Sequence, residues 1–150
     1  MNKLILILSI FILSVSNVHG QIRTIKGTVI SEDLELVPYV TIMSLDTVKI
    51  GQTNLEGQFN ISINKETNQL MFGFVGMEPL TIKFSDNCDK LELIMMYGVH
   101  YDFISLRKAD RLRKKRFDKL PEVRRKAFEQ GIFKSDSLNY SQEFDSYRDN

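Results

Sequence analysis

The sequence predicts an all-β sandwich or barrel with an α-helical extension at its C-terminus, and two patterns indicate this fold class. Between Ile22 and Met96, short apolar stretches alternate with polar turn signals. They recur about every 8–12 residues, a spacing typical of sheets made of short strands. After Tyr97 and Gly98 the apolar residues recur at helical spacing instead. The 150 residues suffice for one domain with an appendage.

Seven strands are expected in the β region. The clearest covers Phe59, Ile61 and Ile63, which alternate with polar residues and therefore predict one buried face and one wet face. Just before it, residues 54–57 read as a four-residue hairpin connection, in which Gly57 adopts positive φ without steric cost. The remaining strands are expected at residues 22–30, 37–43, 48–53, 70–74, 80–84 and 91–95.

Two helices are expected after the strands. Asp102 or Ser105 can cap a first helix that runs to about Lys119. Pro121 ends it and suits the first turn of a second helix, because proline lacks the N–H that an initial helical residue leaves unpaired. Gly131 suits the C-terminal cap of that second helix.

The last segment, residues 134–150, is rich in Ser, Asp and Asn and is expected to be an acidic, flexible tail. Its aromatic residues Tyr140, Phe144 and Tyr147 fall at i, i+4 and i+7. That spacing leaves a docked turn of helix as the alternative.

The N-terminus reads as a cleavable signal peptide. Lys3 precedes an apolar run from Leu4 to Leu13, and the small or β-branched residues Val18 and Gly20 favour cleavage before Gln21. The run is shorter than the roughly 20 residues that a membrane-spanning helix needs, so an uncleaved anchor is the weaker alternative. The expected domains are a signal peptide (1–20), a β-sandwich (21–98), a basic helical extension (99–133) and the acidic tail (134–150).

Charge is segregated along the chain although the total is nearly balanced, with 20 basic and 19 acidic residues. Residues 21–98 carry six basic and ten acidic groups, whereas residues 99–133 carry eleven basic and five acidic groups. Segregation of this kind bears on partners rather than on fold.

Four sequence motifs occur in order over the β region. They are an I-x-G-x-V strand at Ile25–Val29, a proline-led strand at Val37–Ile42, a turn motif ending in G-x-F at Gly51–Phe59, and a V-G strand end at Phe72–Met77, where Met77 replaces the usual aromatic residue. In this order the motifs resemble those of carboxypeptidase regulatory-like domains.

The resemblance implies a seven-stranded transthyretin-like (prealbumin-like) sandwich. Such domains are common in Gram-negative envelope proteins, including the N-terminal extensions of TonB-dependent outer-membrane receptors. Residues 99–150 lie outside the resemblance, and the chain after Tyr97 does not resemble the TonB box of those receptors. The resemblance therefore implies a free-standing module that is periplasmic, outer-membrane-associated or secreted, with no transmembrane segment after signal cleavage.

Nothing in the sequence indicates catalysis, and we expect neither a catalytic residue nor a cofactor. His100 is the one histidine after the signal segment, and its neighbours do not supply a fixed orienting partner. One histidine and the single cysteine, Cys88, cannot build a tetrahedral zinc site. Asp86, Asn87 and Asp89 lack the spacing of a calcium-binding loop, so no metal site is expected.

The sharpest functional feature is basic: residues 107–116 hold seven cations, and residues 124–126 hold three more. The candidate interaction residues are Arg107, Lys108, Arg111, Arg113, Lys114, Lys115, Arg116, Arg124, Arg125 and Lys126. We expect this arm to stand free of the sandwich and to contact a partner protein or an anionic envelope surface. The alternatives are the domain's own acidic body and a merely solvated helix face. Nucleic acid is not expected, since no aromatic residues interleave with the cations.

The leading functional hypothesis is an exported, non-enzymatic module that mediates protein–protein or cell-envelope interaction. The alternative is a carbohydrate- or peptide-binding accessory protein of an outer-membrane, TonB-dependent uptake system. In that case exposed aromatic residues such as Tyr39 or Tyr97 would contact the ligand.

Overall fold

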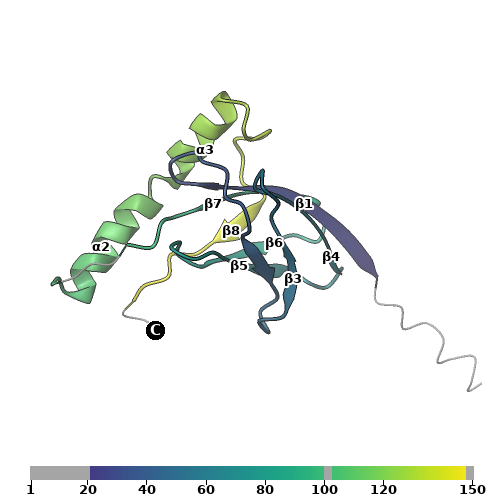
Figure 1. Cartoon of the computed structure of the whole chain (residues 1–150), viewed down its shortest axis with the longest axis horizontal. Coiled ribbons are helices and arrows are strands. Elements are labelled where there is room, and N and C mark those ends of the chain that lie inside the picture. The colour runs from purple at the N-terminus through teal and green to yellow at the C-terminus, as the bar shows by residue number, and fades with distance from the viewer. Residues whose placement is uncertain (1–20, 100–102, 148–150) are drawn as a thin grey trace, which may run out of the picture.

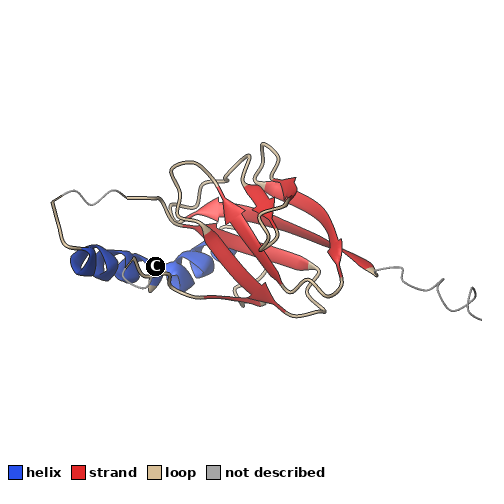
Figure 2. Ribbon diagram, turned by 90° about the horizontal axis from the view of Figure 1, so that it is seen from below, coloured by secondary structure: helices blue, strands red, loops and turns tan. Residues whose placement is uncertain are grey.

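The computed structural model describes residues 21–99 and 103–147, in which two β-sheets pack together beside a pair of helices (Figure 1; Figure 2). The strands are β1 (Ile22–Ser31), β2 (Thr41–Met43), β3 (Lys49–Gln52), β4 (Gln58–Asn64), β5 (Gln69–Gly73), β6 (Leu80–Phe84), β7 (Lys90–Met95) and β8 (Tyr140–Gln142). The helices are α2 (Leu106–Phe117) and α3 (Leu120–Glu129). The fold is therefore mostly β with a C-terminal helical extension, as the sequence predicts.

The strands divide into a sheet of three and a sheet of five. β1 is the middle strand of the smaller sheet, antiparallel to β4 and parallel to β7. The larger sheet has the order β3-β2-β5-β6-β8, with each neighbouring pair antiparallel. The first seven strands occupy the regions where the sequence predicts strands. The eighth comes from the C-terminal segment.

The turn at Gly57 forms, but it connects the two sheets. Gly57 has a φ of +67°, and the Asn54 N–H donates to the Gln58 carbonyl at 2.8 Å. However, β3 pairs with β2 while β4 pairs with β1, so the expectation of a β-hairpin here is wrong. The two ends of the turn are bound to different sheets: the Thr53 hydroxyl donates to the Val37 carbonyl, just before β2, at 2.9 Å, whereas the Gly57 carbonyl accepts from the Val29 N–H of β1 at 2.8 Å.

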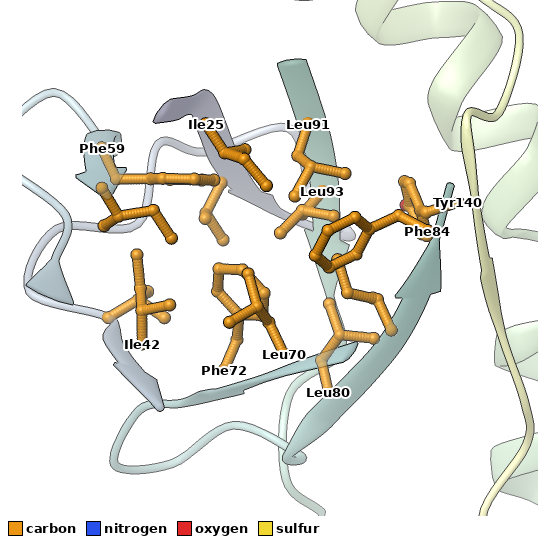
Figure 3. Close-up of a cluster of buried hydrophobic side chains, with 14 of the residues drawn as sticks. Ile25, Ile42, Phe59, Leu70, Phe72, Leu80, Phe84, Leu91, Leu93 and Tyr140 are labelled. Atoms are coloured by element: carbon orange, nitrogen blue, oxygen red, sulfur yellow. The ribbon is translucent and has the colours of Figure 1, made fainter. Parts of the chain in front are cut away.

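The main core lies between the two sheets (Figure 3). Ile25 and Leu93 from the three-stranded sheet meet Ile42, Leu70 and Phe72 from the five-stranded sheet, and all five are fully buried. Each such side chain contributes about 1.5–3 kcal/mol through burial. The residues of this core come from the strands and their connecting loops, and none of them from the two helices.

A second core lies on the outer face of the three-stranded sheet. Ile30 of β1 and Ile94 of β7 point away from the main core and pack with Leu120 and Ala127 of α3 and with Phe133 beyond it. Figure 1 shows α3 beside β1 and β7. The helical extension is therefore bound to the sandwich through an apolar face and does not stand free.

The helix ends agree with the sequence signals. The Ser105 Oγ accepts a hydrogen bond from the Lys108 N–H at 3.4 Å and caps α2, whereas Asp102 lies outside the described residues. Pro121 occupies the first turn of α3. Gly131, with a φ of +74°, closes α3, and its N–H donates to the Phe128 carbonyl at 2.9 Å.

The segment expected to be a flexible acidic tail forms strand β8 instead. Tyr140 pairs with Phe84 at the edge of the five-stranded sheet, and the Tyr140 side chain is buried in the main core (Figure 3). The alternative of a docked helical turn at Tyr140 is also wrong. The edge of β6 supplies unpaired backbone groups that an extended segment can satisfy and a helical turn cannot.

Candidate interaction surface

The ten predicted cations fall into two groups in the structure. Arg113 and Arg124 are buried and Arg116 is half-buried, whereas the other seven are exposed. The buried group holds the helices on the sandwich, and only the exposed group is available to a partner.

Arg113 of α2 is bound to the segment that leads into β6. Its Nε and Nη2 donate to the two carboxylate oxygens of Glu78, each at 2.9 Å, and both side chains are less than one-tenth exposed. Burial alone would lower the pKa of Arg113, but the hydrogen bonds and charge of Glu78 raise it above its ordinary value. This bidentate pair fixes α2 at one position and orientation.

The C-terminal segment covers the same arginine from the other side. The Arg113 guanidinium lies 3.8 Å from the centre of the Tyr147 ring and 5.2 Å from that of Phe144. Asp110, one turn earlier on α2, accepts from the Ser146 hydroxyl at 2.8 Å and from the Tyr147 N–H at 2.9 Å. Strand β8 therefore continues into a segment, residues 143–147, that binds α2 through polar and aromatic contacts.

Arg116, in the last turn of α2, binds the sandwich close to the Arg113–Glu78 contact, since the Glu78 N–H donates to the Met96 carbonyl one residue before Tyr97. Its guanidinium forms an ion pair with Glu32, and its Nη2 donates to the Tyr97 carbonyl at 2.8 Å. Glu32 lies in the loop that follows β1, and its carboxylate also accepts from the Tyr97 N–H at 3.0 Å. This contact ties the last turn of α2 to the loop that follows β1 and to Tyr97.

Arg124 secures α3 and β8 together. Its Nη2 donates to the Tyr140 hydroxyl at 3.1 Å and to the Glu92 carbonyl of β7. Burial, the larger effect, raises the pKa of Tyr140, although the charge of Arg124 opposes it. Arg124 is thus a structural residue at the junction of a helix and the two sheets.

Three of the ten candidates are consequently bound to the domain itself, and the expectation of a free cationic arm is wrong for them. For Arg113 and Arg116 the alternative interpretation is confirmed: they bind acidic residues of the same domain, Glu78 and Glu32. A sequence signal existed: Arg113 lies four residues from both Ala109 and Phe117, in line with the apolar stripe. An arginine in register with apolar positions indicates a buried partner rather than a solvated face.

The exposed cations include three that are paired along their own helix. The i,i+4 pairs are Lys114–Asp118 at 2.7 Å, Lys126–Glu122 at 2.9 Å and Arg125–Glu129 at 3.5 Å. Exposed pairs of this kind contribute little to stability. They do, however, offset the positive charge of those three residues toward any partner.

The outer face of α2 holds the remaining four cations. Within the described part of the chain, no ion pair is found for Arg107, Lys108, Arg111 and Lys115. Arg107, Arg111 and Lys115 follow one another at four-residue steps, so they form one row about 6 Å apart along the helix axis. The opposite face of α2 carries buried Ala109. Lys108 lies beside these three cations, and we call Arg107, Lys108, Arg111 and Lys115 together the cationic row.

A cleft of about 600 Å³ lies between α2 and the edge of the five-stranded sheet, with Met77, Met96 and Phe117 among its lining residues. Its walls also include Arg113 and Glu78, which are already bound to each other. The cleft therefore offers apolar volume, while its buried ionic pair serves the attachment of α2.

No metal or membrane-spanning feature emerges from the described residues. Residues 21–99 and 103–147 contain no group of three or more His, Cys, Asp or Glu side chains placed to hold a metal ion. Neither described helix has the length and apolar character needed to cross a bilayer. His100 lies outside the described residues.

Comparison with known proteins identifies the β region. Residues 25–97 match the family model of the CarboxypepD_reg-like domain, a regulatory, non-catalytic domain family. None of the curated proteins compared with the chain matches it. The matched residues begin in β1 and end just beyond β7, so the match covers the sandwich strands and excludes the helices and β8. The family model therefore matches the β region in which the sequence motifs resemble this family.

Proposed function

We propose that the protein is an exported, non-enzymatic binding module of the cell envelope that contacts its partner, a protein or an anionic surface, through the cationic row of α2. The observation that carries this proposal is the division of the basic residues. Arg113 and Arg116 are used to attach α2 to the sandwich, whereas Arg107, Arg111 and Lys115 remain exposed on its opposite side. The attachment presents the row in a fixed geometry.

A fixed row favours binding because the helix is already ordered. The ion pairs, the second core and residues 143–147 hold α2 before any partner arrives. Binding then avoids the cost of ordering a flexible arm. Electrostatic attraction to a row of unpaired cations also raises the rate of association with anionic partners.

Export is part of the proposal. The apolar run from Leu4 to Leu13, with Lys3 before it, supports secretion across the inner membrane. A periplasmic or outer-membrane location, or release from the cell, would bring the cationic row to envelope components. N-terminal sequencing of the protein recovered from cells tests this step, with Gln21 as the expected first residue.

Co-sedimentation with a Gram-negative cell-envelope fraction tests the binding proposal. A triple variant of the row, R107Q/R111Q/K115Q, is compared with K114Q/R125Q/K126Q, which removes the same charge from residues that are paired along their helices. We expect the first variant to lose binding and the second to retain most of it. Binding of the unchanged protein should also weaken as salt rises from about 0.05 M to 0.5 M. Equal loss in both variants would show that only net charge matters, and would refute the row as the site.

One observation favours the carbohydrate- or peptide-binding alternative. Tyr39 is half-exposed with a strained φ of +59°, and a hollow of about 350 Å³ lies beside Tyr97, lined also by Leu36 and Phe74. An exposed tyrosine ring, with an apolar body and a polar hydroxyl, suits contact with such a ligand. Titration with envelope oligosaccharides and peptides distinguishes this alternative, which requires affinity that is insensitive to salt and is lost in Tyr39→Ala or Tyr97→Ala.

A further inference from the structure

Two apolar side chains are exposed at the beginning of α2. Phe103 is fully exposed, at 106 % of its reference area, and Leu106 is 59 % exposed. Exposed apolar residues scattered singly are ordinary; these two lie close to each other along the chain and beside the cations of the first turn of α2. Arg107 and Lys108 follow directly in the same helical turn.

We call Phe103 and Leu106 the apolar tip. They lie just before α2 and in its first turn, at the end of the helix farthest from the sheets. In Figure 1 and Figure 2 the first turn of α2 lies at the end of the molecule opposite the start of β1. The backbone of Phe103 has a φ of +62°, and Ser105 caps the helix immediately after it. The tip therefore projects from an ordered helix end and is not covered by the sandwich.

We propose that the partner of the cationic row is an anionic phospholipid bilayer, and that the apolar tip inserts into it. This inference rests on the proposed function and names the partner of the same surface. Phe103 and Leu106 would enter the boundary between headgroups and acyl chains, while Arg107, Lys108 and Arg111 would contact lipid phosphates. A basic helix with Phe and Leu at one end has the composition of segments that bind the membrane interface.

The geometry favours a bilayer over a folded protein partner. Leu106 lies on the same face of α2 as Ala109 and Arg113, so a bilayer would be met by the first turn of the helix, where Arg107 and Lys108 flank the apolar tip. The tip offers two protruding side chains. A bilayer accepts such protrusions without a preformed complementary pocket.

The chain contains no tryptophan, so a single introduced tryptophan reports its own surroundings. The purified full chain carrying Phe103→Trp is mixed with vesicles of equal parts phosphatidylglycerol and phosphatidylcholine. We expect a blue shift of its emission and quenching by brominated acyl chains. Val75→Trp is the matched control, because Val75 is 93 % exposed on a loop of the sandwich; its emission should not change.

Affinity for the same vesicles provides the second measurement. F103S/L106S removes the tip without changing charge, and L55S/V75S removes two comparably exposed apolar side chains of the sandwich. We expect the tip variant to bind about tenfold more weakly and the control to bind within about twofold of the unchanged protein. All variants keep residues 1–20, so any contribution of that apolar segment is the same in each. Vesicles of phosphatidylcholine alone should bind weakly, because they lack the anionic charge.

The outcomes separate this inference from the proposed function. If the protein binds the envelope fraction through the row but does not bind protein-free vesicles, the row is a site for another envelope component and the bilayer inference is wrong. Binding confined to lipopolysaccharide without phospholipid overturns it in the same way. If R107Q/R111Q/K115Q binds both preparations as well as the unchanged protein does, the proposed function fails as well.

Discussion

Arg113 and Glu78 form a bidentate ion pair, with Nε–Oε1 and Nη2–Oε2 distances of 2.9 Å each, that joins helix α2 to the segment before β6. Both partners are buried. Ionic groups withdrawn from water are stable only when their hydrogen bonds are satisfied, and removal of one partner leaves the other charge uncompensated. The pair is therefore the contact of α2 whose loss should cost most.

Arg113→Met should lower the free energy of unfolding by about 3–5 kcal/mol, because Glu78 then remains buried without its partner. The double variant with Glu78→Gln should lose less than the sum of the two single variants, since no charge at position 78 is then buried without Arg113. Asp110, which also accepts from Arg113 at 3.3 Å, loses that contact equally in the single and the double Arg113 variants. Denaturant unfolding measures all three. Arg111→Met, on the exposed side of α2, is the control and should stay within about 0.5 kcal/mol of the unchanged protein. Additive losses would contradict direct coupling between the two side chains.

The Tyr140 hydroxyl is the next testable contact. Tyr140→Phe keeps the ring in the main core but removes the acceptor for Arg124. We expect a loss of about 1.5–3 kcal/mol, the range for a hydrogen bond to a charged group. Tyr140→Ala should cost about 3–5 kcal/mol, because it also leaves a cavity. Hydrogen exchange at the amides of β8 should accelerate more in the alanine variant, and unchanged protection there would show that β8 does not depend on this anchor.

The pH dependence of stability follows from two buried acids. Burial, the main cause, raises the pKa of the Cys88 thiol above its ordinary 9.0 and that of the Tyr140 phenol above its ordinary 10.0. The unfolded chain therefore releases these protons at lower pH than the folded chain does. The stability that they contribute is fully present below the ordinary values and is lost as pH rises through them toward the folded pKa values.

We therefore expect the free energy of unfolding to decline from about pH 9 upward, as measured by urea unfolding at a series of pH values. Cys88→Ala should remove the part of the decline that begins first, and Tyr140→Phe the part that begins about one unit higher. An identical slope in the unchanged protein and in both variants would assign the alkaline decline to other groups.

Local sequence patterns predict the strands well, because the alternation of apolar and polar residues that specifies a strand lies within the strand itself. The alternation of Phe59, Ile61 and Ile63 specifies a strand with one buried face, and the structure places these residues in β4 with that burial pattern. The pattern says nothing about which strand is the partner. For that reason the local pattern predicts a hairpin at Gly57, whereas the turn connects strands of two different sheets.

Contacts between distant segments were beyond local reasoning. β8 pairs Tyr140 with Phe84, residues 56 positions apart, and no short pattern in residues 134–150 indicates a strand at that edge. The prediction of a free cationic arm is wrong in part for a different reason. Charge composition alone cannot separate Arg113, which is buried against Glu78, from Arg111, which is exposed; only register with the apolar stripe distinguishes them.

Gly27 explains why the first strand motif of the domain has glycine at its centre. A side-chain carbon added to Gly27 would collide with the Leu91 carbonyl oxygen on the parallel neighbour β7 and with the ring of Phe59 on β4. The Leu91 oxygen belongs to the backbone of a paired strand and cannot move without breaking the ladder between β1 and β7. Close packing of the main core leaves no space into which the Phe59 ring could shift.

Gly27→Ala should therefore destabilise the domain by more than about 3 kcal/mol, at or beyond the upper end of the range for overpacked cores. Gly73→Ala is the matched control, because its added carbon would meet only the flexible end of Met43, at 3.4 Å. We expect the control to change the unfolding midpoint little. If Gly27→Ala gives too little folded protein to measure, Gly27→Ala combined with Phe59→Leu tests the same cause, since the smaller side chain vacates part of the colliding volume and should restore some folded protein. Recovery of as much folded protein with Gly27→Ala alone as with the pair would show that the Phe59 ring is not what excludes a side chain from this position.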